Sequence, residues 1–261
     1  MTQPQLALIT GASSGIGFEL AKQFAQAGYD LVVAADDDGI HEVPAKLAEF
    51  GVAVQPVQVD LRTPEGVEHL FQSTIEGDRI LAAAALNAGT GRGEMFLKSE
   101  LDEDFNIIDL NVRSTVHLAK LVLRDMANRD RGKLLFTSSI VAGMPGPYQP
   151  LYNASKSFIQ SFAEAIRHEL QDTAITVTAL MPGPTDTNFF HRAKMEDSLI
   201  GKMPKDDPAK VARQGFEALM RGDQKVVASS LSSKLMGAAN SVLPDSVKAA
   251  ANKVISRPLS G

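Results

Sequence analysis

Short apolar runs alternate along the chain with longer segments in which apolar residues recur at helical spacing. The runs with the length and composition of buried strands are 5–10, 30–35, 52–59, 80–86, 133–138 and 174–180. Continuous apolar strands separated by helices are typical of a parallel sheet that is covered on both faces and joined by right-handed crossovers. The pattern therefore predicts an α/β fold, a doubly wound parallel sheet of the Rossmann type.

The run at 80–86 is ambiguous because it contains four consecutive alanines, which by propensity favour a helix. It is short, however, and it ends abruptly at Asn87-Ala88-Gly89. We predict a strand there, and a helical run of alanines is the alternative.

The chain after the sixth run has a different character. Residues 184–206 are irregular, mixed in charge and rich in turn formers, which predicts a lid over a binding cleft. Residues 229–261 show weak helical periodicity, with Val247 and Val254 among the apolar positions, and are expected to form a helical C-terminal extension packed on the body or on a neighbouring subunit. No linker separates these parts, so a single domain over 1–261 is predicted.

Composition excludes several classes of function. The net charge is −5, and we find no clustered Lys and Arg of the kind that nucleic acid or an anionic membrane requires. The chain has no cysteine, so it has no disulfide and no thiol nucleophile. The histidines have no metal-ligand spacing, so no metal is predicted, and His191 is the one that could meet a substrate. The first residues carry neither a signal peptide nor a membrane span, which makes the cytoplasm the default location.

The first predicted strand runs into the sequence TGASSGIG at 10–17. Gly11, Gly15 and Gly17 permit a tight turn, a close approach of the backbone to a pyrophosphate and close packing of the next helix, whose N-terminal amides attract anions. A plain strand-to-helix turn is the alternative, but the place of this motif after the first strand favours a dinucleotide site.

Asp36 ends the second predicted strand, nineteen residues after Gly17. A carboxylate there accepts hydrogen bonds from a ribose diol and repels a 2′-phosphate, which favours NAD(H) over NADP(H). The alternative is a solvated turn of three aspartates, of which one at most needs a role.

The other predicted strands also end in small, polar or turn-forming residues. These residues are Asp60, Asn87-Ala88-Gly89, Ser138-Ser139 and Pro182-Gly183. In an open parallel sheet the carboxyl ends of the strands share one rim, where ligands bind, so these residues are expected to gather around one crevice.

The stretch YNASK at 152–156 places a phenol and an ammonium four residues apart. On a helix such residues share a face at about 6 Å, so Lys156 can act on Tyr152. A nearby cation lowers the pKa of a tyrosine from its ordinary value of about 10. An ordinary helix that happens to hold both residues is the alternative.

Taken together, TGxxxGxG at 10–17, NAG at 87–89, YxxxK at 152–156 and PGPTDT at 182–187 resemble the single-domain type of the short-chain dehydrogenase/reductase family. The resemblance covers roughly residues 5–228. It implies a catalytic set of Asn111, Ser139, Tyr152 and Lys156. Ser139 is favoured over Ser138 because it lies thirteen residues before Tyr152, the usual interval in the family.

The resemblance also implies that Asp60 contacts adenine, that NAG lies beside the adenosine ribose and that the Thr187 hydroxyl meets the nicotinamide carboxamide. The residues expected to hold the dinucleotide are Gly11, Ser13, Ser14, Gly15, Ile16, Gly17, Asp36, Asp60, Leu61, Asn87, Ala88, Gly89, Tyr152, Lys156, Pro182, Gly183, Thr185 and Thr187.

The cofactor preference departs from the family pattern. Many relatives carry an arginine where this chain has Asp36 and a basic residue where it has Ser14, both for the 2′-phosphate of NADP. Relatives that use NAD usually place their aspartate one residue earlier, where this chain has Ala35. NAD(H) is therefore favoured, and NADP(H) is not excluded.

The expected reaction is a reversible hydride transfer between a nicotinamide and a secondary alcohol or ketone. Tyr152 exchanges the proton at oxygen, Ser139 donates a hydrogen bond to that oxygen, Lys156 lowers the tyrosine pKa, and Asn111 holds a water that links Lys156 to solvent. The alternatives are an NADPH-dependent carbonyl reductase and a dinucleotide-binding regulator without turnover.

Apolar residues near the predicted rim suggest the substrate pocket. Met144, Tyr148, Phe189 and Phe190 are candidate lining residues, although each could instead serve packing. By family resemblance alone, a homodimer or homotetramer is expected.

Overall fold

The structure, a computed structural model, describes residues 5–77, 79–228 and 244–257. Seven parallel strands form one sheet in the order β3-β2-β1-β4-β5-β6-β7. The strands are β1 (Leu6–Thr10), β2 (Asp30–Ala35), β3 (Val54–Gln58), β4 (Leu81–Leu86), β5 (Gly132–Thr137), β6 (Ile175–Pro182) and β7 (Lys225–Ala228). Strand order reverses between β1 and β4, which confirms the predicted doubly wound sheet and places a ligand crevice beyond the carboxyl ends of these strands.

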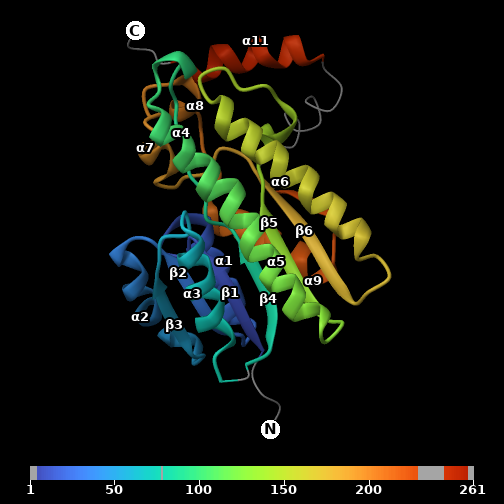
Figure 1. Cartoon of the computed structure of the whole chain (residues 1–261). Helices are drawn as coiled ribbons and strands as arrows, with labels where there is room; N and C mark the ends of the chain where they lie inside the picture. Colours follow the sequence, from blue (N-terminus) through green and yellow to red (C-terminus); the bar gives the residue numbers. More distant parts are fainter. Residues whose placement is uncertain (1–4, 78, 229–243, 258–261) are drawn as a thin grey trace.

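Helices cover both faces of the sheet (Figure 1). One face carries α3 (Pro64–Ile75), α5 (Ser114–Ala127) and α6 (Pro150–Glu169), and the other carries α1 (Gly15–Gln26), α2 (Val43–Lys46) and α9 (Pro208–Arg221). The side chains of β1 alternate between the two cores: Leu6 and Leu8 join the first, and Ala7 and Ile9 join the second. Both faces are buried, which explains why the strands are continuous apolar runs.

The sequence predicted one of the less obvious strands and missed another. The alanine run forms β4 as predicted, because the central position between β1 and β5 lets small side chains pack under helices on both faces. The edge strand β7 was not predicted. It has four residues and begins at the exposed Lys225, so it is too short to show a strand period.

The predicted lid, 184–206, contains the short helices α7 (Phe189–Arg192) and α8 (Leu199–Lys202). Its two ends are tied together: the Asp206 amide donates to the Pro184 carbonyl at 2.7 Å, and the Asp186 amide donates to the Asp206 carbonyl at 2.9 Å. The helix α4 (Leu101–Ile108), like α7 and α8, lies beyond the end of the sheet opposite the N-terminus (Figure 1).

The C-terminal extension is described in part, as helix α11 (Asp245–Ser256), and the predicted helix over 229–243 lies outside the described residues. The apolar positions that suggested α11 are exposed, Val247 by 47% and Val254 by 63%, whereas Asn252 and Ser256 are buried. In the part of the chain that the structure describes, no helix has the length and apolar content needed to cross a bilayer.

Candidate active site

Helix α6 brings Tyr152 and Lys156 to the carboxyl end of β5. The helix begins at Pro150, whose missing N–H costs nothing in a first turn. One turn after Tyr152, the buried Lys156 Nζ donates to the Thr137 carbonyl at 2.9 Å and lies 5.7 Å from the centroid of the tyrosine ring. The helix therefore places the phenol and the ammonium on one face, as the YxxxK spacing predicted.

Burial decides the protonation of this pair. It raises the pKa of Tyr152 to about 12, although a hydrogen bond with the Ser139 side chain acts in the opposite direction. Burial also lowers the pKa of Lys156 to about 8. The expected net lowering of the Tyr152 pKa is wrong in this structure, because desolvation of the buried phenol is the largest effect on its pKa and the group that lowers it is Ser139 rather than Lys156.

The two serines after β5 have different partners. Ser138 Oγ donates to the Lys156 carbonyl at 3.0 Å and so holds α6 against the strand. Ser139 Oγ donates to the Pro182 carbonyl at 3.4 Å and accepts from the Val141 amide at 3.3 Å, and its side chain also forms a hydrogen bond with Tyr152. The structure thus brings Ser139, the serine chosen from the sequence interval, to the phenol.

Asn111 lies in a π-helical turn, Asp109–Arg113, of the kind often found at functional sites. Its Oδ1 accepts from the Thr90 amide at 2.8 Å, and its Nδ2 donates to the Thr90 carbonyl at 2.8 Å and to Ser155 Oγ at 2.9 Å. Its side chain therefore braces the loop after β4 against α6. The predicted role in holding a water beside Lys156 stays a prediction.

The NAG motif joins three strand ends. Asn87 Nδ2 donates to the Thr10 carbonyl at 3.2 Å, and its Oδ1 accepts from Thr137 Oγ1 at 3.0 Å. Gly89 keeps the crevice open, since a Cβ there would lie 3.4 Å from Lys156 Nζ. The motif both fixes the sheet end and leaves space beside the lysine.

The glycine turn forms a cradle between β1 and α1. Gly11 and Gly15 have left-handed φ angles of +66° and +57°, and a Cβ at Gly17 would lie 2.0 Å from the Gly11 carbonyl oxygen. The first turn of α1 lines the cleft and contains no acidic side chain. Free amides at a helix N-terminus suit a phosphate, so this turn fits the pyrophosphate of a dinucleotide.

The three aspartates after β2 differ in their hydrogen-bond partners. Asp37 accepts from Ser13 Oγ at 2.7 Å, and Asp38 accepts from Gln58 Nε2 at 2.8 Å. The Asp36 carboxylate accepts no hydrogen bond from the described residues and lines a hollow next to the glycine turn. Asp36 is thus the carboxylate with spare hydrogen-bonding capacity for a ligand.

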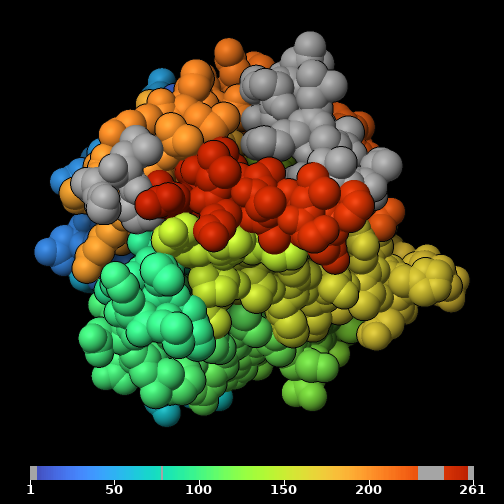
Figure 2. Space-filling model, turned by 90° about the horizontal axis from the view of Figure 1, so that it is seen from above, coloured from blue at the N-terminus to red at the C-terminus, as the bar shows by residue number. Residues whose placement is uncertain are grey.

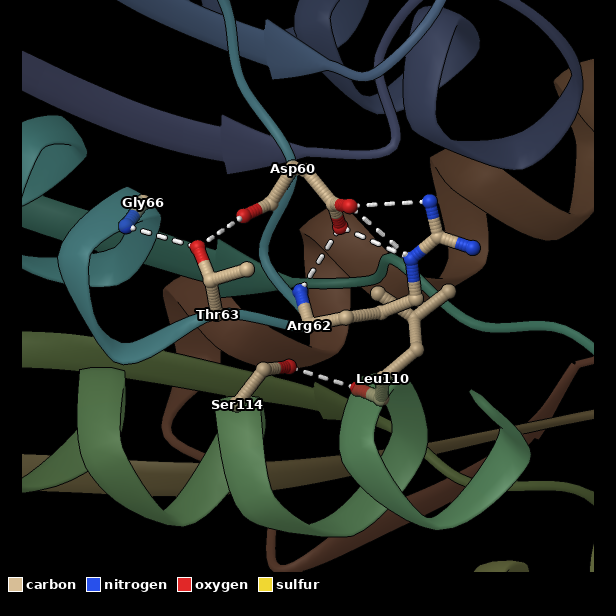
Figure 3. A network of polar contacts seen from close by, with 6 residues as sticks. All are labelled: Asp60, Arg62, Thr63, Gly66, Leu110 and Ser114. Carbon is tan, nitrogen blue, oxygen red and sulfur yellow. Dashed lines mark hydrogen bonds and ion pairs between the residues drawn. The ribbon is translucent and has the colours of Figure 1, made fainter. Parts of the chain in front are cut away.

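Asp60 faces the same hollow but is bound to Arg62 (Figure 3). Arg62 Nε donates to Asp60 Oδ1 at 2.8 Å and Nη2 donates to Oδ2 at 2.8 Å, and the Arg62 amide also donates to Oδ1 at 2.9 Å. This fork holds the pKa of Asp60 below its ordinary value. The predicted contact of Asp60 with adenine stays a prediction, and any such contact would share the carboxylate with Arg62.

Two hollows with shared lining residues lie along the rim. The larger has an empty volume of about 1140 Å³ including its open mouth, and the smaller has about 620 Å³. The larger is lined by the predicted residues Gly11, Ser14, Gly15, Ile16, Gly17, Asn87, Ala88, Gly89, Ser139, Met144, Tyr152, Lys156, Pro182, Gly183, Thr185, Thr187, Phe189 and Phe190. The smaller is lined by Ser13, Asp36, Asp60 and Leu61 together with the shared Gly11, Ser14, Ala88 and Gly89.

Two residues predicted near the substrate lie elsewhere. Tyr148 has a left-handed backbone, φ +68°, its carbonyl accepts from the Glu94 amide at 2.7 Å, and its side chain does not line the cleft. His191 is exposed and pairs with Glu196 at 3.0 Å. The positive φ and the pairing with a neighbouring charge are local effects that a sequence pattern does not show.

The cleft also contains residues that sequence reasoning missed, namely Ile140, Val141, Gln149, Arg192, Met195, Ile200 and Ile255. Arg192 lines both hollows. Most of these residues lie in the predicted lid or in residues 143–150, a connection with three prolines that leads to Tyr152. Their residue types alone could have marked them as candidates for the cleft. Ile255 had no such signal, because only the fold returns the C-terminal helix to the site.

Comparison with known proteins agrees with this geometry. The model of the short chain dehydrogenase family matches residues 5–197. The 3-oxoacyl-(acyl-carrier-protein) reductase of Pseudomonas aeruginosa is 30% identical over 209 residues, which are 77% of this chain and 83% of that protein.

Two solved structures are similar in fold. A short-chain dehydrogenase from Sphingobium yanoikuyae in complex with NADPH has a TM-score of 0.80 at 26% identity, covering 91% of this chain and 94% of that one. A short chain dehydrogenase/reductase from Burkholderia phymatum in complex with NAD has a TM-score of 0.79 at 22% identity, covering 86% and 89%. With the glycine cradle and the Ser139, Tyr152 and Lys156 cluster, these matches show that the chain belongs to the short-chain dehydrogenase family of NAD(P)-dependent oxidoreductases.

Proposed function

We propose that the protein interconverts a secondary alcohol and a ketone by hydride exchange with NAD(H), with Tyr152 as the proton donor and acceptor. The observation that carries the proposal is the hydrogen bond between the Ser139 and Tyr152 side chains in the same cleft as the glycine cradle. Two hydroxyls in this arrangement can both donate hydrogen bonds to one substrate oxygen. These bonds stabilise the negative charge that a carbonyl oxygen gains during hydride transfer.

The bound nicotinamide supplies or accepts the hydride. Side chains of the protein supply the proton and stabilise the charge on the oxygen. With its pKa raised to about 12, Tyr152 is protonated at neutral pH and is therefore in the donating state for carbonyl reduction. Ser139 stabilises the developing charge on the same oxygen. Lys156, with a pKa lowered to about 8, still carries its positive charge at neutral pH and stabilises the negative charge that develops on the phenol as it gives up its proton.

The preference for NAD(H) is supported by the charges around the smaller hollow. Asp36 has spare acceptor capacity toward a ribose diol, and Asp37 lines the same hollow. Arg62 interacts electrostatically with Asp36, but its guanidinium is paired with Asp60. Among the lining residues of this hollow, Asp36, Asp37 and Asp60 outnumber the single cation Arg192, so a 2′-phosphate would meet a surplus of negative charge at this end of the site.

The apolar residues that line the larger hollow support the proposed substrate class. Met144, Phe189, Phe190, Met195 and Ile200 line it, and such a wall suits an apolar ketone with few polar anchors. The name of the Pseudomonas aeruginosa relative, a 3-oxoacyl-(acyl-carrier-protein) reductase, describes reduction of an oxo group, which is the same class of reaction.

A homodimer or homotetramer is the proposed assembly. Six large apolar side chains between residues 95 and 108 are exposed, with Leu97 at 91%, and clusters of exposed apolar side chains mark contact regions in proteins. Size-exclusion chromatography with light scattering tests this directly, and a monomer at micromolar concentration would contradict it.

A panel of aliphatic and alicyclic ketones and their alcohols, assayed with each dinucleotide at equal concentration, tests the reaction. We expect turnover, followed by absorbance of the reduced nicotinamide, with NADH faster than NADPH. Dinucleotide binding without turnover on any member would instead favour a regulator, and faster turnover with NADPH would favour the carbonyl reductase alternative.

A further inference from the structure

Helix α11 is fixed against the connection that leads to Tyr152 by a chain of buried polar side chains. Gln149 Nε2 donates to Ser256 Oγ at 3.0 Å, and Ser256 Oγ donates to Asn252 Oδ1 at 2.7 Å. Asn252 Nδ2 in turn donates to the Pro145 carbonyl at 3.3 Å. All three side chains are buried, and both ends of the chain of bonds lie on the 143–150 connection. A buried polar network specifies position, so α11 is held at one place on the body.

The same helix reaches the cleft through Ile255. This side chain packs against a small apolar core of the lid that contains Phe190, Ala193, Met195 and Ile200. It also lines the larger hollow. Figure 2 shows α11, in red, lying across the molecule between the lid segment in orange and the yellow-green chain around the start of α6.

Three separate segments therefore contribute apolar residues to the wall of the cleft. The connection contributes Met144, whose carbonyl accepts from Asn153 Nδ2 at 3.1 Å, the lid contributes Phe190, and α11 contributes Ile255. The hydroxyls that act on the reacting oxygen line the same hollow, with Tyr152 on α6 and Ser139 just after the end of β5. Because Ile255 lines the hollow in which a carbonyl would meet Ser139 and Tyr152, the apolar substituent of a substrate bound there can contact α11.

We propose that α11 is a wall of the substrate pocket and that Ile255 sets the size of the apolar chain or ring that the site accepts. The reaction in this inference is that of the proposed function, on which it rests, whereas the position of Ile255 in the hollow does not depend on that function. The substrate class it names is ketones with a linear or cyclic apolar substituent. Because an apolar pocket separates substrates by one methylene about 10- to 200-fold at most, resizing one wall residue is expected to change chain-length selectivity within that range.

The test uses the full chain and a series of 2-alkanones of increasing length. Ile255→Ala enlarges the pocket, Ile255→Phe reduces it, and Val254→Ala is the matched control on the exposed side of the same helix. Two readouts are taken: kcat/KM with NADH, and the shift in melting temperature that each ketone produces in the presence of NADH. Ile255→Val is a milder variant in case the larger changes impair folding.

We expect the ratio of long-chain to short-chain kcat/KM to rise about 10-fold in Ile255→Ala and to fall in Ile255→Phe. Ile255→Val should change it slightly in the direction of Ile255→Ala, and Val254→Ala should leave it unchanged. Turnover with the same selectivity in every variant would overturn the inference and leave the proposed function standing. Melting shifts that follow the size of residue 255 without turnover would support the wall and overturn the proposed reaction. The absence of both turnover and ketone-induced shifts would overturn both.

Discussion

The ring of Phe189 packs against the ring of Tyr152, with centroids 5.1 Å apart and an angle of 46° between the planes. Gly91 makes this contact possible, because a Cβ at that position would lie 2.7 Å from Phe189 Cζ and 3.1 Å from Tyr152 Cδ2. A lid residue therefore helps to bury the phenol whose pKa burial raises to about 12. Under the proposed function, the lid would therefore bear on proton transfer as well as on the shape of the substrate pocket.

Replacing Phe189 with alanine should expose the phenol to water and bring the Tyr152 pKa down toward its ordinary value of about 10. Ketone reduction needs the protonated phenol, so kcat/KM should begin to fall near pH 10 in Phe189→Ala, where the wild type shows no loss from this group. Loss of the pocket wall should also lower kcat/KM at neutral pH about 10-fold. Phe189→Leu, which keeps the site covered, should retain the wild-type pH profile, and equal profiles in all three proteins would show that the ring is not what buries the phenol.

Lys156 should make the stability of the fold depend on alkaline pH. Its pKa is lowered from 10.5 to about 8, so below pH 8 the folded state bears the full cost of a buried charge. As pH rises from 8 to 10.5 the unfolded chain binds more protons than the folded one, and this cost is relieved. The free energy of unfolding of the wild type should therefore rise relative to Lys156→Met in this window, by at most about 3 kcal/mol.

Urea unfolding at pH 7, 8, 9 and 10 measures this difference. Lys120→Met removes an exposed lysine from α5 and is the control, for which no comparable trend is expected. A constant difference between wild type and Lys156→Met across these pH values would contradict the burial of a charged Lys156.

The glycine cradle should tolerate no side chain at Gly17. The added Cβ would lie 2.0 Å from the Gly11 carbonyl oxygen, which forces the turn apart, and such overpacking typically costs about 1–3 kcal/mol. Gly17→Ala should lower the melting temperature and weaken NADH binding, measured by calorimetric titration, by about 10-fold or more, which corresponds to about 1.4 kcal/mol. Gly143→Ala, at a glycine with open space around it, should affect neither quantity. Unchanged NADH affinity in Gly17→Ala would argue against this turn as the phosphate site.

The sequence predicted those features that depend on local pattern. The strand runs, the glycine turn, the aspartate at the end of β2 and the Tyr152-Lys156 spacing are local, and the parallel sheet places them at one rim. It misjudged the Tyr152 pKa because burial depends on groups distant in sequence, such as Phe189 in the lid. It missed Ile255 for the same reason, and β7 because a four-residue edge strand carries too little periodicity.

Asp36 should control the choice of dinucleotide. Asp36→Arg removes the acceptor for a ribose diol and adds a cation for a 2′-phosphate, so the ratio of kcat/KM for NADPH to that for NADH should rise about 10-fold or more. Asp38→Arg makes the same change of charge at a residue that does not line the hollow, and it should alter the ratio much less. Equal effects of the two substitutions would mean that general charge rather than a contact at Asp36 determines the preference.

The central claim is that the Tyr152 hydroxyl exchanges the proton with the substrate oxygen. Tyr152→Phe keeps the ring and its contact with Phe189 but removes the hydroxyl. The decisive measurement is kcat/KM for the best ketone of the panel in this variant, alongside its affinity for NADH. We predict a loss of about 10²–10⁴-fold in kcat/KM with unchanged NADH affinity. Ketone reduction at the wild-type rate by Tyr152→Phe would contradict the account.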